Sequence, residues 1–227
     1  MNYTFAFSDV LAAWPRFLQG LLYTVELSIV SIVTGFVLGT LCAVVRHHRT
    51  PYLRHVVAIY VELIRNTPFL VQAFLVFFGL SSLGLRLSAE VCAVLALTLN
   101  AGAYTCEIMR AGLDAIHRGQ MEAAEAMGMT RPAIYWHVLL LPAVENVYPA
   151  LTSQFVLVML STSITSQISA EELTAIASLV QSETFRSFEV YLIVGGLYLV
   201  LSFLFRCGFW AIHRLISPRR RLLDAAA

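Results

Sequence analysis

The hydrophobic positions of this chain run in long blocks that charged residues barely interrupt. Between Phe17 and Val45 the ionisable side chains are Tyr23, Glu26 and Cys42. This block is longer than the roughly 20 apolar residues that carry a helix across a bilayer. Similar blocks follow at about 56–85, 89–109, 143–168 and 190–209. The pattern predicts an all-α polytopic membrane protein with five transmembrane helices.

Composition supports this class and excludes others. Of the 227 residues, 59% are hydrophobic and 13% are charged, whereas a soluble domain carries about 25% charged residues. The net charge of +1 gives no support to nucleic-acid binding. The four cysteines fall within or near the blocks without ligand or redox spacing, so we expect apolar packing and no metal site. We expect one membrane domain over 1–227, with a core at about 17–215 and no cleaved leader.

The arginines predict the orientation of the chain, which contains no lysine. Cytoplasmic loops are enriched in basic residues. Ten arginines follow the first, third and fifth blocks: Arg46, Arg49, Arg54, Arg110, Arg118, Arg131, Arg214, Arg219, Arg220 and Arg221. The segments on the other side hold Arg16, Arg86 and Arg186. We therefore expect the N-terminus outside, the C-terminus inside, and a membrane-surface role for the terminal arginines.

The longest predicted cytoplasmic loop, at about 111–141, contains "QMEAAEAMGMTRPAIYWHVLLLPA". Its first residues, Gln120–Met127, are strong helix formers. Gly128 then permits a reversal with positive φ, and Pro132 suits the first turn of a second helix capped by Thr130 or Arg131. The sequence predicts two short helices joined by a bend. Such an element can dock a soluble partner, and an ordinary amphipathic interfacial loop is the alternative.

Polar side chains inside the blocks are candidates for a pathway, because they are costly in lipid and usually face a cavity. The candidates are Arg65, Gln72, Asn100, Tyr104, Gln154, Ser161, Thr162 and Ser163. Each alone can also serve as a contact between helices, and Arg65 can form a structural pair with Glu62. Pro68 predicts a bend in the second block.

Two further expectations concern the ends of the blocks. Glu107 and Arg110, at the inner end of the third block, are expected to brace the loop. After the fourth block, "ISAEELTAIASLVQSETF" places apolar residues at helical spacing, which predicts an external amphipathic helix. The apolar positions are Leu173, Ile176, Ala177 and Val180.

The loop resembles the EAA loop of ABC-importer permeases. The matching positions in "GQMEAAEAMGM" are Gly119, Gln120, Glu122, Ala123, Ala124 and Gly128. "YVELIRNTPFLVQ" from Tyr60 and "LTLNAGAYTCEIMRAGL" from Leu97 resemble the polar amino acid branch, which includes permeases for histidine, glutamine, glutamate, arginine and opines. The resemblance runs from about Gly20 to Leu215. One departure is Leu160-Ser161, where the branch often has Lys-Asp.

This resemblance implies a multi-pass subunit of an importer in the bacterial inner membrane. It implies two ATP-binding subunits that hold ATP and magnesium, a second permease subunit, and a periplasmic or lipid-anchored solute-binding protein. The chain has no Gly-x4-Gly-Lys phosphate loop, so we expect no catalytic residue and no cofactor in it. A secondary transporter or channel driven by an ion gradient is the alternative, and a membrane scaffold is a third. The sequence leaves open the exact substrate and whether the partner permease is identical or paralogous.

Overall fold

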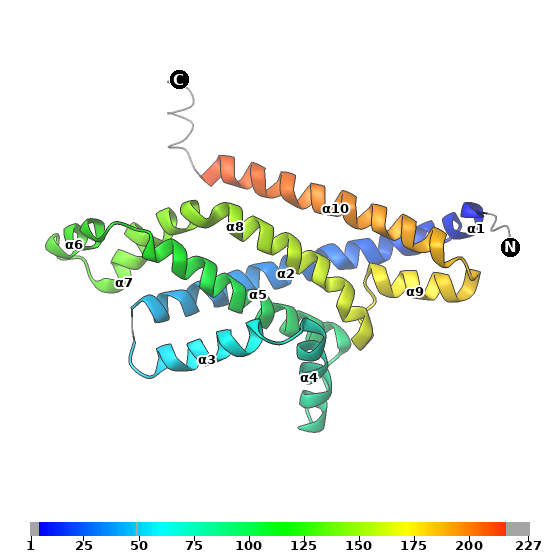
Figure 1. The fold of residues 1–227 in the computed structure, drawn as a ribbon, viewed down its shortest axis with the longest axis horizontal. Coiled ribbons are helices and arrows are strands. Elements are labelled where there is room, and N and C mark those ends of the chain that lie inside the picture. The colour runs from blue at the N-terminus through cyan, green and yellow to red at the C-terminus, as the bar shows by residue number, and fades with distance from the viewer. Residues whose placement is uncertain (1–4, 49, 217–227) are drawn as a thin grey trace, which may run out of the picture. The chain divides into compact units, whose positions relative to one another are not determined.

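The computed structural model describes residues 5–48 and 50–216, and it places helices over nearly all of them (Figure 1). Arg49 and Arg219–Arg221, which contribute to the predicted charge asymmetry, lie outside the described residues. The helices in chain order are α1 Phe7–Leu11, α2 Trp14–His47, α3 Leu53–Arg65, α4 Phe69–Ser82, α5 Ala89–Asp114, α6 Arg118–Ala126, α7 Arg131–Ile134, the π-helical turn η1 Tyr135–Leu139, α8 Leu140–Ser161, the 3-10 helix η2 Thr162–Ile168, α9 Leu173–Thr184 and α10 Ser187–Ile216.

The predicted membrane class and helical fold are confirmed. Among the described residues, four stretches are long and apolar enough to cross a membrane: α2, α5, the run from Arg131 to Ile168, and α10. A fifth is obtained when α3 and α4 are counted as one bent span. The bend that Pro68 predicts in the second block is confirmed, with an angle of 112° between α3 and α4. Pro68, which has no N–H and disfavours helix in the residue before it, separates the two helices.

The described helices divide into two compact units. The first comprises the chain up to Val33, Thr67–Thr98 and Val156–Phe205, and the second comprises Thr34–Asn66, Leu99–Phe155 and the chain from Arg206. Four long helices, α2, α5, α8 and α10, contribute residues to both units. The expectation of one membrane domain over 1–227 therefore stays a prediction.

The core of the first unit is built around α9. Leu173, Ala177 and Val180 are buried on one face of this helix, which confirms the predicted amphipathic pattern. They pack with residues of α1, α2 and α10: Val10, Phe17, Val190 and Val194. Gly20 permits the close approach of α2, because a Cβ there would lie 3.0 Å from the Leu173 Cα.

A buried carboxylate caps α9 and connects it to α10. Glu172 accepts hydrogen bonds from the backbone N–H groups of Thr174 and Ala175, both at 2.9 Å. The Tyr198 hydroxyl of α10 donates to the same carboxylate at 2.6 Å. Burial raises the pKa of Glu172, and the three donors oppose that rise by stabilising the ionised form. The start of α9 is thus held by a side chain that is itself fully enclosed.

Replacement of this cap is expected to destabilise the first unit. Glu172→Ala removes the N-cap and leaves the Tyr198 hydroxyl without its carboxylate, for a loss of about 2–3 kcal/mol. Thermal unfolding of the purified protein in detergent measures the effect. Glu171→Ala, at the exposed neighbouring position, is the matched control and should change stability little. Equal shifts for the two variants would contradict the role of the cap.

Candidate functional site

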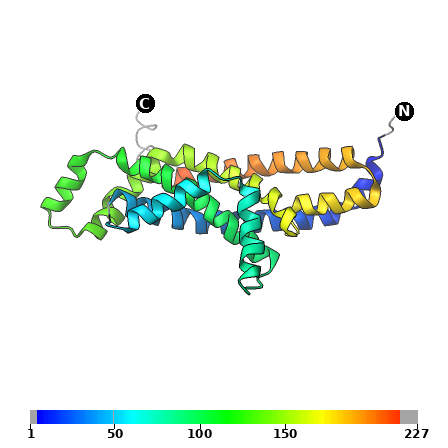
Figure 2. The ribbon, with the colours of Figure 1, turned by 60° about the horizontal axis from the view of Figure 1, so that its bottom comes forward.

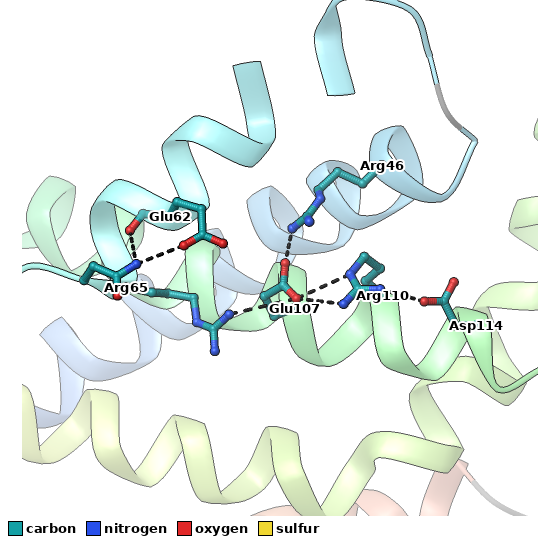
Figure 3. A network of polar contacts seen from close by, with 7 residues as sticks. Arg46, Glu62, Arg65, Glu107, Arg110 and Asp114 are labelled. Atoms are coloured by element: carbon teal, nitrogen blue, oxygen red, sulfur yellow. Dashed lines mark hydrogen bonds and ion pairs between the residues drawn. The ribbon is translucent and has the colours of Figure 1, made fainter. Parts of the chain in front are cut away.

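The second unit contains a network of charged side chains centred on Glu107 of α5 (Figure 3). Arg46, in the last turn of α2, donates to the Glu107 Oε1 atom. Arg110, one turn further along α5, donates to Oε2 from Nε and Nη2 at 3.3 and 3.0 Å. Arg65, the last residue of α3, places its Nη1 atom 3.9 Å from Oε2. One carboxylate therefore attracts arginines from three helices.

The three arginines are not equally engaged by Glu107. Arg46 and Arg110 both donate directly to the carboxylate, and Arg110 also pairs with Asp114 at 2.7 Å. The Arg65 side chain is 41% exposed, against 36% for Arg110 and 22% for Arg46, and its Cζ atom lies 5.6 Å from the centre of the Tyr104 ring. Its contact with Glu107 is the longest of the three, at 3.9 Å, so Arg65 is the arginine that Glu107 engages least.

The alternative interpretation of Arg65 as the partner of Glu62 is wrong. The Glu62 carboxylate accepts instead from the Asn66 side-chain amide at 2.9 Å, and Asn66 also donates to the Glu62 carbonyl oxygen. Asn66 competes successfully because it follows the last helical residue and can fold back over that end. The arginine then extends toward Glu107 (Figure 3).

Three of the other candidates, Asn100, Tyr104 and Gln154, accompany Arg65 in the second unit. Asn100 lies one turn before Tyr104 on α5, and Gln154 lies on α8. Both side chains are half-buried. Of the candidates in this unit, the structure brings Arg65 and Tyr104 into contact.

The remaining candidates belong to the first unit. Gln72 is buried and donates to both the carbonyl and hydroxyl oxygens of Thr67 at 3.0 Å. Ser161, Thr162 and Ser163 donate to the carbonyl oxygens of Leu157, Met159 and Leu160 respectively. Such back-bonding by hydroxyl groups competes with regular α-helix, and α8 gives way to 3-10 helix at Thr162. The helix α4, which carries Gln72, packs against η2 in this unit.

The predicted two-helix loop is present in the second unit, where α6 and α7 form the two arms of a turn (Figure 2). Gly128 between them has φ +76°, as the reversal required. Glu122 and Ala123 are exposed on α6, whereas Ala124 is buried. Gly119 and Gln120 lie in its first turn, where the His117 side chain accepts from the Gly119 N–H.

The predicted range of this loop, about 111–141, includes the ends of two long helices. α5 extends to Asp114, and α7 continues through η1 directly into α8, so the second arm is the beginning of the next membrane helix. Thr130 occupies the N-cap position of α7 as expected but makes no capping hydrogen bond with its side chain. α6 packs against both α7 and η1. Movement of α6 is therefore coupled to the start of α8 by packing and by continuous helix.

Sequence reasoning missed several residues of the network. Arg46 entered only as a charge, and His47, Asp114 and Tyr135 did not enter as site residues. His47 Nδ1 lies 2.6 Å from the Tyr135 hydroxyl, and its Nε2 lies 3.8 Å from Asp114. The available signal was a cation at the end of the first span, Arg46, and a carboxylate near the end of the third span, Glu107. Spacing along the chain does not say which two spans are neighbours.

Comparison with known proteins places these features in context. Residues 35–222 match the family described as the binding-protein-dependent transport system inner membrane component. The octopine transport system permease protein OccM of Rhizobium meliloti is 36% identical over 225 residues, which cover 94% of this chain and 92% of the relative. The probable glutamine ABC transporter permease protein GlnM of Bacillus subtilis is 35% identical, over 89% of this chain and 92% of its own length.

Solved structures agree with the fold. A crystal structure of an amino acid ABC transporter with histidines superposes with a TM-score of 0.82 at 33% identity, over 93% of this chain and 99% of that one. An inward-facing MetNI methionine ABC transporter superposes with a TM-score of 0.77 at 22% identity, over 90% of this chain and 98% of that one. Because the identity is only 22%, the likeness to the methionine transporter concerns the fold alone.

Loss of the central carboxylate is expected to destabilise the second unit. Glu107→Gln leaves Arg46 and Arg110, both partly buried, without their shared counter-charge, at a cost of about 1–3 kcal/mol. Thermal unfolding of the purified protein measures it. Glu62→Gln is the control, because this exposed carboxylate accepts from Asn66 at a helix end, and it should shift stability by less than about 0.5 kcal/mol. A control that is equally destabilising would show that Glu107 does not hold the network together.

Proposed function

The chain belongs to the family of binding-protein-dependent transport system inner membrane components, and on that premise we propose that it carries polar amino acids or amino acid derivatives such as opines. It is a membrane-embedded permease subunit of the ABC importer type. The substrate class is supported by relatives named for octopine and glutamine and by a matching structure described as an amino acid transporter. The observation that carries the proposal of ATP-driven import is the α6–Gly128–α7 turn, an exposed element suited to docking.

The proposed role of this turn is coupling. Two ATP-binding subunits, which hold ATP and magnesium, each receive the α6 helix of one permease. Glu122, Ala123 and Glu125 are exposed on α6 and available for that contact. Because α6 packs on η1, and η1 continues into α8, closure of the ATP-binding subunits shifts a membrane helix as a rigid body.

The proposed contact with substrate is made by Arg65. An amino acid brings a carboxylate into a medium where an unpaired charge is costly, and a guanidinium can bind both carboxylate oxygens. Arg65 is the most exposed arginine of the network and the one that Glu107 engages least, and its guanidinium lies over the Tyr104 ring. The position before Thr162 carries Ser161, which has no charge to meet a cationic side chain. The proposed preference is for neutral or acidic side chains over strongly cationic ones.

The remaining partners complete the proposed assembly. A second permease subunit, identical or paralogous, forms the pathway together with this one. A periplasmic or lipid-anchored binding protein delivers the substrate on the side of α9. Transport that requires ATP and persists when ion gradients are collapsed separates this proposal from a secondary transporter or channel.

A substitution at the turn tests coupling. Gly128→Val places a β-branched residue at φ +76°, a strain of about 1–3 kcal/mol. We expect reduced stimulation of ATP hydrolysis by substrate-loaded binding protein in the reconstituted complex. Gly84→Val is the matched control, because Gly84 also has a positive φ, +86°, but lies between α4 and α5. Normal coupling in the Gly128 variant would rule out the docking role.

Substitutions at the proposed substrate contact test specificity. Arg65→Gln should lower uptake of labelled glutamine in proteoliposomes by roughly 10-fold, which corresponds to about 1.4 kcal/mol, and leave assembly and basal ATP hydrolysis intact. Ser161→Asp should increase competition by arginine. If Arg65→Gln prevented assembly and Ser161→Asp left the competition profile unchanged, the substrate would bind elsewhere. Where the partner permease is a paralogue, equivalent variants are needed in both subunits.

Labelling of single cysteines tests the proposed orientation, with the N-terminus outside and the C-terminus inside the inner membrane. The background replaces the native Cys42, Cys92, Cys106 and Cys207. An impermeant thiol reagent should label Ser178→Cys and Ser187→Cys in intact cells, and His55→Cys only after permeabilisation. All three positions are exposed in the structure. The reverse pattern would invert the topology.

A further inference from the structure

The second unit contains an apolar groove that adjoins the α6–α7 turn at α7 and has no part in the contacts of Glu107. Its volume is about 680 Å³. One wall is the second half of α2 from Phe36 together with His48, which follows the helix, and the other runs from Arg131 to Val144 through α7, η1 and α8. Several lining side chains are open to the surroundings, with Val37, Leu41 and Leu141 each more than half exposed.

The polarity of the groove changes along its length. Phe36, Val37 and Val144 line one end, while His48 and Arg131 line the other. His48 follows the last residue of α2, and Arg131 is the first residue of α7, so both lie at the same end of the two membrane stretches. Arg131 forms no ion pair with any of the described residues. Trp136, 72% exposed, also lines the groove, and tryptophan favours the interface between membrane and water.

The dimensions fit one leaflet of a bilayer. His48 lies twelve positions after Phe36, which corresponds to about 18 Å at the helical rise of 1.5 Å per residue. Half the hydrocarbon core of a bilayer is about 15 Å. The groove therefore offers an apolar wall over the depth of one leaflet and a cation at the level of the headgroups.

We propose that this groove binds an anionic phospholipid of the leaflet at its Arg131 end, with an acyl chain along α2 and η1 and the phosphate at Arg131 and His48. Under the orientation given in the proposed function, this leaflet is the cytoplasmic one. The lipid site itself does not depend on the proposed function. A soluble partner cannot reach walls made of membrane-spanning helix. In a two-fold contact at this groove, a second copy would bring its own Arg131 to the interface. The like charges of the two arginines disfavour that contact.

Photolabelling of the reconstituted complex tests the site. The probes are phosphatidic acid and phosphatidylcholine with the same photoactivatable acyl chain, each at low mole fraction in phosphatidylcholine vesicles. Phosphatidic acid should label peptides within 36–48 and 131–144 about fivefold more than phosphatidylcholine, which corresponds to about 1 kcal/mol for one basic residue near an anionic lipid. Arg131→Gln should reduce this labelling to the phosphatidylcholine level, and Arg131→Lys should restore most of it.

Matched variants separate recognition from general surface charge. Arg54→Gln removes an exposed arginine that does not line the groove and should leave labelling unchanged. Val37→Trp should block the groove, whereas Val33→Trp, one turn earlier on α2 and similarly exposed, should not. Equal labelling by the two lipids, equal effects of Arg54→Gln and Arg131→Gln, or capture of a second permease at the groove would overturn the proposal. Uptake by the wild-type complex in the same vesicles tests the proposed function separately.

Discussion

Every backbone polar group at membrane depth must find its partner inside the protein, because hydrocarbon offers none. Long helices satisfy this requirement, and side chains satisfy it where the helices are interrupted. At the break before Pro68, Asn66 donates to the Glu62 carbonyl and Gln72 donates to the Thr67 carbonyl. The amide side chains at this break therefore maintain an irregular backbone.

The same requirement changes the interpretation of the polar candidates. A side chain already committed to its own backbone has less capacity to bind a substrate, and this applies to Gln72 and to the 161–163 hydroxyl groups. Hydroxyl oxygens still retain lone pairs as acceptors, which suits a substrate ammonium group better than a carboxylate. Arg65 differs from them, because its donors are only partly occupied by Glu107. The carboxylate end of a substrate is thus the end for which the described residues offer a specific partner.

Features that depend on a few consecutive residues could be predicted from the sequence. The turn at Gly128 and the buried face of α9 both follow from local pattern, since they require one backbone conformation or one helical period. The network of Glu107 could not be predicted in the same way. Its partner Arg46 lies 61 residues away along the chain, and the choice of partner depends on which helices are neighbours. The Glu62–Arg65 interpretation failed for a related reason, because helical spacing permits a pair without deciding which acceptor the arginine prefers.

Glu107 has three arginines around its carboxylate and engages them unequally. Arg46 and Arg110 occupy both oxygens, and Arg65 is left at the edge of the site. Under the proposed function, a substrate carboxylate at Arg65 would compete with the weakest of these contacts and leave the two stronger ones in place. Arg110 in turn pairs with Asp114, the last residue of α5 before the segment that leads into α6. Under the proposed function, one short series of ion pairs therefore runs from the substrate contact at Arg65 to the inner end of α5, all within the second unit.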